Sequence, residues 1–171
     1  LEPYVAYFAG QGIDRLVWEP ELFYSCKDPA GPVPSPAVGP IDITGRPRAF
    51  IYGPYITLPP GSWSADIVLG FSTEAAGMGF FIEVCAGAQL ASTHVQPNAE
   101  QVIETSLQFT IDEAASTPVE VRVFNERAAF DGRVILGSIV LTPHGAVDSA
   151  VQRQLLEALR HQGHEFEGTS A

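Results

Sequence analysis

The chain has 171 residues, of which 46% are hydrophobic and 17% are charged, and this length and composition predict one folded domain with a core of its own. Nine Lys and Arg residues against 20 Asp and Glu residues give a net charge of −11, which repels phosphate backbones and argues against nucleic acid as a partner. No apolar stretch approaches the roughly 18 residues that span a bilayer, so we predict no membrane insertion.

The first third of the chain combines aromatic patches with a proline-rich stretch. Residues 1–8 and 16–24 are rich in aromatic and branched apolar side chains, which favour short strands. Residues 28–40 contain five prolines, and proline lacks the backbone N–H that a helix or a sheet ladder needs. We therefore expect residues 28–48 to form a Pro/Gly-rich surface loop that crosses one edge of the fold.

From residue 49 onward, hydrophobic side chains recur with a period of two. In 62–71 and 101–112, apolar residues alternate with polar ones, which is the pattern of a strand with one solvent-exposed face. Shorter or weaker patterns of the same kind occur at 49–56, 78–86, 88–95, 118–126 and 133–142. Six or seven strands without intervening helices predict an all-β domain, a jelly-roll sandwich of two antiparallel sheets, and exclude a parallel α/β fold.

After Pro143 the hydrophobic period changes to that of a helix. Residues 147–161 place apolar side chains on one stripe, and Gly163 follows as a C-terminal stop. This helix would either pack on the sandwich or bind a partner. The predicted domain organisation is a β-sandwich domain at 1–145, a C-terminal α-helix at 146–162 and a flexible tail at 163–171.

The cysteines show no metal-binding spacing, and the helix-end histidines leave two interpretations open. Cys26 and Cys85 are the only cysteines and form no CxxC motif, so they would be free thiols or, in an oxidising compartment, a disulfide. His161 and His164 lie at the end of the expected helix, where they would favour the negative end of the helix dipole or form a flexible metal-binding pair.

The sequence contains no nucleophile elbow, metalloprotease motif, phosphate-binding loop or dinucleotide fingerprint. Glu83, Glu104 and Glu120 are outward carboxylates in strand patterns, and two carboxylates across one sheet face are what a glycosidase needs. Charged residues on the exposed face of a sandwich also serve simply to keep a protein soluble. We therefore predict no catalytic residue.

The run from Tyr52 to Trp63, YGPYITLPPGSW, is followed by an alternating strand. With the segments 121–125 and 134–141 and the loop between them, it resembles jelly-roll carbohydrate-binding modules, notably those of families six and thirty-five. The resemblance implies a non-catalytic accessory module that binds carbohydrate or accompanies a carbohydrate-active or polysaccharide-biosynthesis enzyme, as in bacteria. The alternatives are a protein–protein interaction or assembly domain that uses a sheet face or the C-terminal helix, and a polysaccharide lyase or glycosidase.

The resemblance also implies a sugar site in the loops at one end of the sandwich. In those modules an aromatic platform works with an Asn or an acidic partner. A platform such as Phe130 would stack on the apolar C–H face of a pyranose, or would anchor its own loop. The corresponding carbohydrate-binding residues here would be Asn125, Glu126, Arg127, Phe130 and Asp131, with Tyr52 or Tyr55.

Modules of those families often hold a structural calcium between early acidic residues and an Asp of the last strand. Glu19 and Glu21 would be the early ligands here, but Ser138 stands where the Asp is expected. We therefore predict no cofactor and no metal site, with a structural calcium as the alternative. The expected partner is a carbohydrate or a protein, and the oligomeric state is left open.

Overall fold

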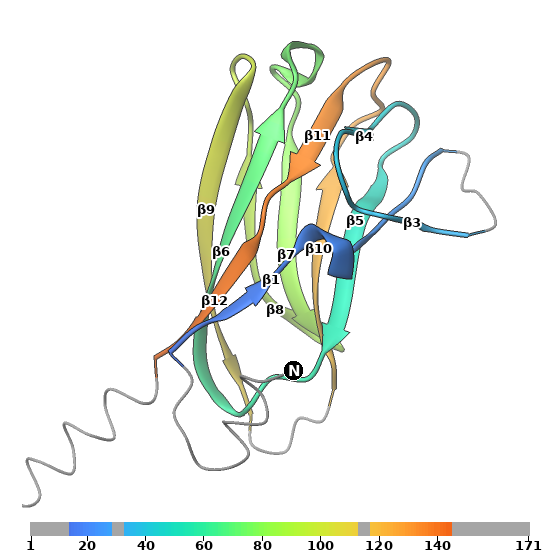
Figure 1. The fold of residues 1–171 in the computed structure, drawn as a ribbon. Helices are drawn as coiled ribbons and strands as arrows, with labels where there is room; N and C mark the ends of the chain where they lie inside the picture. Colours follow the sequence, from blue (N-terminus) through green and yellow to red (C-terminus); the bar gives the residue numbers. More distant parts are fainter. Residues whose placement is uncertain (1–13, 29–32, 113–116, 145–171) are drawn as a thin grey trace, which may run out of the picture.

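The chain folds as a sandwich of two antiparallel β-sheets, here called sheet A and sheet B (Figure 1). The computed structural model describes residues 14–28, 33–112 and 117–144. These residues confirm the predicted all-β sandwich. The expected strand at 1–8, the helix at 146–162 and the tail at 163–171, with their histidines, lie outside the described residues. Within the described ranges, no helix is long and apolar enough to cross a membrane.

Sheet A is built around the long strand β6. On one side β6 pairs with β9 along the full length of both strands, and on the other it pairs with β11 and β12, which are flanked by β4 and β1. In the described part of the chain, β9 therefore forms one edge of this sheet. The bounds are β1 Leu16–Trp18, β4 Ile41–Asp42, β6 Gly61–Phe71, β9 Gln101–Ile111, β11 Arg133–Leu136 and β12 Ile139–Pro143.

Sheet B has the strand order β3-β2-β5-β10-β7-β8. Its last two strands form the hairpin expected across Gly87, whose φ of 76° is the conformation that favours glycine. The central strand β10 pairs with β5 on one side and β7 on the other. The bounds are β2 Tyr24–Ser25, β3 Ser35–Pro36, β5 Arg48–Ile56, β7 Phe80–Ala86, β8 Ala88–Val95 and β10 Val119–Asn125.

The N-terminal third differs from the sequence prediction in two places. The expected strand at 16–24 is interrupted by a 3-10 turn, η1 (Pro20–Leu22), because proline at the start of the turn ends the sheet ladder. The expected loop at 28–48 contains the short strands β3 and β4, and its Ile41 and Ile43 are buried. Prolines are tolerated in β3 because it is an edge strand. A second 3-10 turn, η2 (Thr73–Ala75), follows β6.

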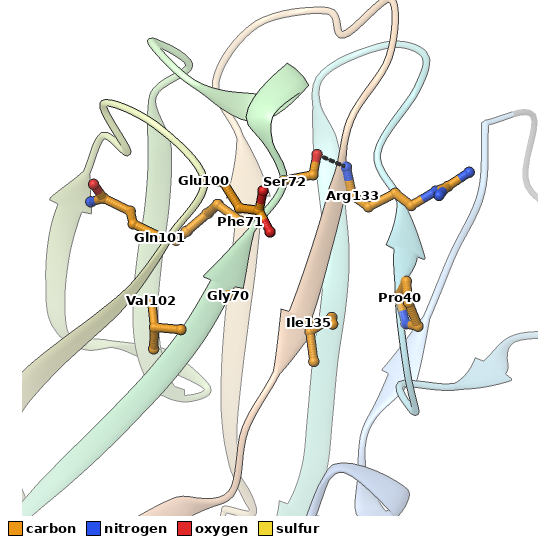
Figure 2. Close-up of a pocket in the computed structure, with 9 residues that line it drawn as sticks. All are labelled: Pro40, Gly70, Phe71, Ser72, Glu100, Gln101, Val102, Arg133 and Ile135. Carbon is orange, nitrogen blue, oxygen red and sulfur yellow. Dashed lines mark hydrogen bonds between the residues drawn. The ribbon is translucent and has the colours of Figure 1, made fainter.

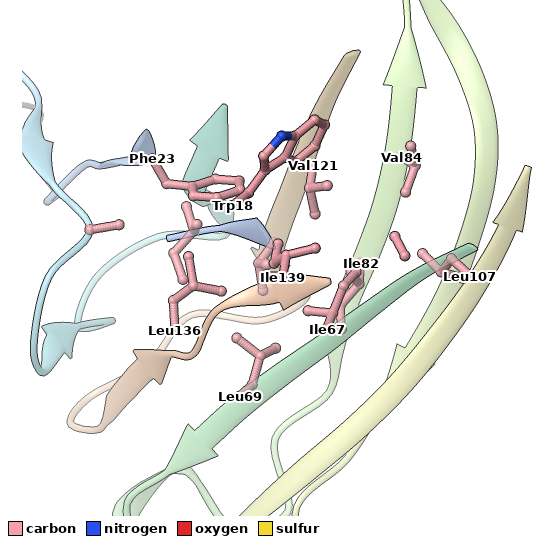
Figure 3. Close-up of a cluster of buried hydrophobic side chains, with 14 of the residues drawn as sticks. Trp18, Phe23, Ile67, Leu69, Ile82, Val84, Leu107, Val121, Leu136 and Ile139 are labelled. Carbon is pink, nitrogen blue, oxygen red and sulfur yellow. The ribbon is translucent and has the colours of Figure 1, made fainter. Parts of the chain in front are cut away.

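One apolar layer fills the space between the sheets (Figure 3). Alternate residues of β6, β7 and β10 point into it, and Ile67, Ile82 and Val123 are fully buried. The layer also holds Trp63, whose indole Nε1 donates a hydrogen bond to the Pro59 carbonyl at 2.9 Å. The buried indole is therefore satisfied, and the outward residues of the same strands face solvent on either side of the sandwich.

Replacement of Ile67 by alanine tests the layer. Ile67→Ala leaves a cavity at a position that is 0% exposed, and we expect it to lower the free energy of unfolding by about 2–5 kcal/mol in urea titrations. Ile135→Ala, in the same sheet at a position that is 46% exposed, is the matched control and should cost less than about 1 kcal/mol. Equal losses in the two variants would contradict the assignment of the inner face.

Candidate functional site

The outer face of sheet B carries a connected group of aromatic and charged side chains. Strand register places Tyr52, Arg122 and Glu83 in one row across β5, β10 and β7, with Tyr24 of β2 beside Tyr52. These are the outward positions of strands whose other side chains fill the core. We call this surface the aromatic face, and it comprises Tyr24, Tyr52, Phe81, Glu83, His94, Glu120, Arg122 and Phe124.

Arg122 is the centre of the aromatic face. Its Nη2 lies 2.8 Å from Glu83 Oε1 and donates to Cys85 Sγ at 3.0 Å, and its Nε lies 3.6 Å from Glu120 Oε1. Its guanidinium also lies over the Phe124 ring, 5.8 Å from the ring centroid. Nε is buried and has no hydrogen-bond partner within the described residues. The guanidinium is thus held in one place by two carboxylates, a thiol and a ring.

The carboxylate of Glu83 is almost completely covered, with 8% of its side chain exposed. A buried carboxylate is costly unless it is paired, and Arg122 provides the pair. The hydrogen bond to Cys85, helped by both carboxylates, raises the pKa of Arg122. Burial raises the pKa of the Cys85 thiol despite the nearby guanidinium. The thiol is therefore protonated at neutral pH and is no nucleophile.

Aromatic side chains lie on both sides of Arg122. Tyr24 and Tyr52 are stacked, with ring centroids 5.8 Å apart, and Tyr24 is 42% exposed. On the other side, Phe81 lies 5.9 Å from Phe124 and 4.9 Å from the His94 ring. The face therefore offers apolar ring surface beside charges that are already fixed.

Tyr55 lies farther along β5. It is 49% exposed and adopts a φ of 62° that is uncommon outside glycine. Burial of its hydroxyl and a hydrogen bond to Glu120 raise the pKa of Tyr55 to about 12, and burial also raises that of Tyr52. Both phenols therefore stay protonated at neutral pH and serve as hydrogen-bond donors or acceptors.

Asn125 is buried, and its side-chain amide is engaged by backbone groups. It is 1% exposed; its Nδ2 donates to the carbonyls of Arg46 and Arg127, and its Oδ1 accepts from the Arg48 N–H. All three partners are backbone groups of the loops beside β5 and β10. Asn125 therefore holds these loops together. The sequence suggested it as a carbohydrate-binding residue because an Asn at the end of a strand can be either a buried structural amide or an exposed binding amide, and the sequence pattern is the same in both cases.

The other predicted loop residues lie at the end of the sandwich. Phe130 is 99% exposed and Arg127 is exposed. Asp131 accepts a hydrogen bond from the Gly132 N–H, and Glu126 Oε1 lies 2.8 Å from His94 Nδ1. The loop thus presents Phe130 to solvent, while Glu126 reaches toward the aromatic face. The predicted set is divided between the loop end and that face, where Tyr52 lies.

Two backbone hydrogen bonds of 2.9 Å between Gly45 and Ala129 connect this loop to the segment before β5. That segment is fixed by Asp28, whose carboxylate accepts hydrogen bonds from the Arg46 N–H and guanidinium. Gly45 has a φ of 118°, and a Cβ there would lie 2.5 Å from Asp28 Cβ. The position therefore requires glycine.

The three carboxylates considered for catalysis do not share a face. Glu83 and Glu120 lie on the aromatic face and both contact Arg122, whereas Glu104 lies on β9 in sheet A. The sequence alone could not show this arrangement, because outward alternation does not tell which sheet a strand joins.

The expected calcium ligands and cysteines have other contacts. Glu19 accepts a hydrogen bond from the Ser138 hydroxyl, so these two positions do meet, while Glu21 is exposed on η1. No group of three or more His, Cys, Asp or Glu side chains that could hold a metal ion occurs in the part of the chain that the structure describes. Cys26 and Cys85 are both free cysteines, so the disulfide alternative is not realised here.

A groove of about 540 Å³ lies on the outer face of sheet A (Figure 2). Its floor is Gly70 of β6, and its walls include Val102 of β9 and Ile135 of β11, which are 70% and 46% exposed. Polar side chains surround its upper end. The complete lining is Pro40, Gly70, Phe71, Ser72, Glu100, Gln101, Val102, Arg133 and Ile135.

Sequence reasoning missed most of the aromatic face. Tyr24, Phe81, His94, Arg122 and Phe124 were not singled out, and Tyr52 was assigned to a loop site. The available signal was Phe124, since the alternation in 119–125 buries the valines and leaves phenylalanine outward. Which outward residues are neighbours depends on the strand order of sheet B, which alternation does not determine.

Comparisons with known proteins give likenesses of structure alone. No protein-family model matches the chain, and no curated protein matches it. A cyclase from Fischerella sp. TAU is 12% identical with a TM-score of 0.41 over 54% of this chain and 56% of its own. This chain thus spans little more than half the length of that cyclase.

Two carbohydrate-binding modules are also similar. The C-terminal CBM6 of LamC, a marine laminarinase from Zobellia galactanivorans, is 15% identical with a TM-score of 0.43 over 75% of this chain and 98% of its own. TmCBM61, solved in complex with β-1,4-galactotriose, is 11% identical with a TM-score of 0.45 over 81% of this chain and 94% of its own. The similar structures thus include a module of family six, one of the two families that the sequence resembles. At these values the likeness assigns no family, ligand or activity to this chain.

Removal of Arg122 tests the ion pair with Glu83. Arg122→Ala leaves a buried carboxylate unpaired, and we expect a loss of about 2 kcal/mol in the free energy of unfolding. This is less than the roughly 3–5 kcal/mol of a fully buried pair, because Arg122 is itself one-third exposed. Glu83→Gln added to Arg122→Ala should recover part of the loss. Arg133→Ala, at an exposed guanidinium of sheet A, is the control. An unchanged stability of Arg122→Ala would contradict the pairing.

The pH dependence of stability tests the contact between Asp28 and Arg46. Hydrogen bonds from Arg46 lower the pKa of Asp28 from 3.8 to about 2. A carboxyl group whose pKa is lower in the folded protein than in the unfolded chain stabilises the fold. This contribution is complete at pH values above the pKa of the unfolded chain, and it is lost as the pH falls toward the pKa of the folded protein. Asp28→Asn should therefore be less stable than the parent at pH 6, and the difference should shrink between about pH 4 and pH 2. Asp14→Asn serves as the control, and a difference independent of pH would argue against this contact.

Proposed function

We propose that this domain is a non-catalytic accessory module that binds carbohydrate on the aromatic face of sheet B. The observation that carries the proposal is the stacked pair of Tyr24 and Tyr52 beside the fixed guanidinium of Arg122. Sugars present apolar C–H faces ringed by hydroxyls, and aromatic rings beside polar groups complement both parts.

Preorganisation supports this function. Arg122 is held by Glu83, Glu120 and Phe124, so the face loses little side-chain entropy when a ligand binds. The protonated phenol of Tyr55 adds hydrogen-bonding capacity at this surface. Weakly binding polar ligands such as sugars profit most from a surface that is already ordered.

The charge of the face favours neutral glycans. Arg122 is matched by two carboxylates, Glu83 and Glu120, with Glu126 beside His94 at one end. The chain as a whole carries a net charge of −11. An anionic polysaccharide would be repelled by this field, whereas an uncharged one would not.

The accessory role is part of the same proposal. A domain of this kind would accompany a carbohydrate-active or polysaccharide-biosynthesis enzyme in a bacterium and hold it near its substrate. The sequence resemblance to jelly-roll carbohydrate-binding modules supports this role. The lyase or glycosidase alternative has less support, because Glu83 and Glu120 are both engaged by Arg122 and Glu104 lies on the other sheet.

The binding site is tested with a glycan array of neutral and acidic oligosaccharides. We expect the parent protein to retain neutral glycans, and Tyr24→Ala and Tyr52→Ala each to weaken binding about tenfold, since loss of one stacking ring is worth 1–2 kcal/mol. Phe130→Ala, which removes the fully exposed ring of the loop end, is the matched control and should bind as the parent does.

The same three variants distinguish a sugar site on the aromatic face from one in the loops at the end of the sandwich. Loss of binding in Phe130→Ala with normal binding in Tyr24→Ala and Tyr52→Ala would move the sugar site to the loops named by the sequence resemblance. Absence of any retained glycan would reject carbohydrate as the ligand.

A protein-interaction domain is the second candidate function. The groove of Figure 2 favours it, because Val102 and Ile135 expose apolar surface on either side of Gly70 in sheet A. This surface is separate from the aromatic face, so the two functions are compatible in one domain.

A further inference from the structure

We infer that the free edge of β9 binds a second copy of this chain by antiparallel strand pairing. The strand runs from Gln101 to Ile111 at the margin of sheet A (Figure 1). Its only strand partner within the described residues is β6, and the pairing with β6 is regular from end to end. The opposite side of β9 therefore presents backbone N–H and C=O groups that no strand of the described chain uses.

The edge lacks the features by which soluble proteins usually protect such strands. Protected edges are short, bulged, or carry proline or lysine. β9 spans eleven residues, contains neither Pro nor Lys, and has Glu104 as its one charged residue. Its pairing with β6 shows no register shift. A long, unbulged and nearly uncharged edge is a template for a further strand.

Two apolar side chains of β9 are incompletely buried, which suggests that another strand covers them in a dimer. Val102 is 70% exposed on the outer face, and Ile103 is only partly buried on the inner face. A neighbouring strand on this edge would cover both, because directly opposite side chains in an antiparallel pair lie about 5 Å apart.

The sequence of β9 is self-complementary in the full-length register. Pairing of all eleven positions with the same strand of a second copy places Ser106 on the two-fold axis. On the outer face, Glu104 then lies opposite Gln108 of the second copy, so an amide donates to a carboxylate and no like charges meet. On the inner face, Ile103 lies opposite Phe109. A partner of unrelated sequence would not require this symmetry, which is why a second copy is the better occupant.

The dimer should be weak and should strengthen with salt. Pairing along one edge buries less than the roughly 1,200 Å² typical of stable interfaces. Each copy brings a net charge of −11, and this repulsion is screened as ionic strength rises. We therefore expect dissociation in the micromolar range or above, and tighter association at 0.5 M than at 0.05 M NaCl.

Sedimentation equilibrium of the full chain over a range of concentrations tests the inference. Gln108→Glu sets carboxylates opposite Glu104 and should weaken the dimer at least tenfold. Adding Glu104→Lys to Gln108→Glu sets opposite charges across the axis and should restore it. Gln89→Glu, the same change on the edge strand β8 of sheet B, is the control and should leave the dimer constant within about twofold.

The side chains of residues 104 and 108 are both exposed, and thermal unfolding of each variant checks that the fold is kept. A parent protein that stays monomeric at millimolar concentration overturns the inference. A dimer that responds equally to Gln89→Glu and Gln108→Glu, or one that the double variant fails to restore, also overturns it. The outcome is independent of carbohydrate binding, which is measured on the other sheet.

Discussion

The two sheets share a single apolar layer, and this layer constrains almost every side chain of the long strands. β6 contributes Trp63, Ile67 and Phe71 from one side while β10 contributes Val121 and Val123 from the other. Since successive side chains of a strand point to opposite faces, the intervening residues must point to solvent. Shifting the central strand β10 by one residue would bury Arg122 in place of a valine, so the identity of the outer faces is determined by the inner one.

The outer faces of the two sheets have different characters as a result. Sheet B has large rings and charges at its outward positions, with Arg122 at their centre. Sheet A has small or short residues along β6, so that Gly70 becomes the floor of a groove. The first surface suits a polar ligand with apolar patches, and the second suits contact with protein. One core therefore supports two surfaces that do not compete for residues.

Local sequence pattern predicted the fold well where it depends on alternation. The strands at 62–71 and 101–112 and the hairpin across Gly87 correspond to β6, β9 and the β7–β8 pair. The pattern did not predict the interruption of the strand at 16–24, where Pro20 begins a 3-10 turn. The ends of such short strands depend on contacts with distant residues. Ile41 and Ile43 are buried although their surroundings are rich in Pro and Gly, because tertiary packing draws them into the core.

The candidate site could be predicted only in part, because its members come from five strands. Tyr24 and Tyr52 are 28 positions apart and meet through the pairing of β2 with β5. Alternation marks each as outward or inward but does not say which outward residues become neighbours. For Asn125 the position at the end of a strand could be predicted from the sequence. Its burial among backbone groups could not, because those groups come from distant parts of the chain.

The amide of Asn125 has an evolutionary consequence. It recognises only main-chain atoms of residues 46, 48 and 127, so the side chains at the tips of those loops are free to diversify without loss of the anchor. Phe130 projects from one of them. Varying the exposed residues 127, 128 and 130 while Asn125 and the buried Ala129 are kept would therefore change the surface of this end of the domain and leave the scaffold beneath in place.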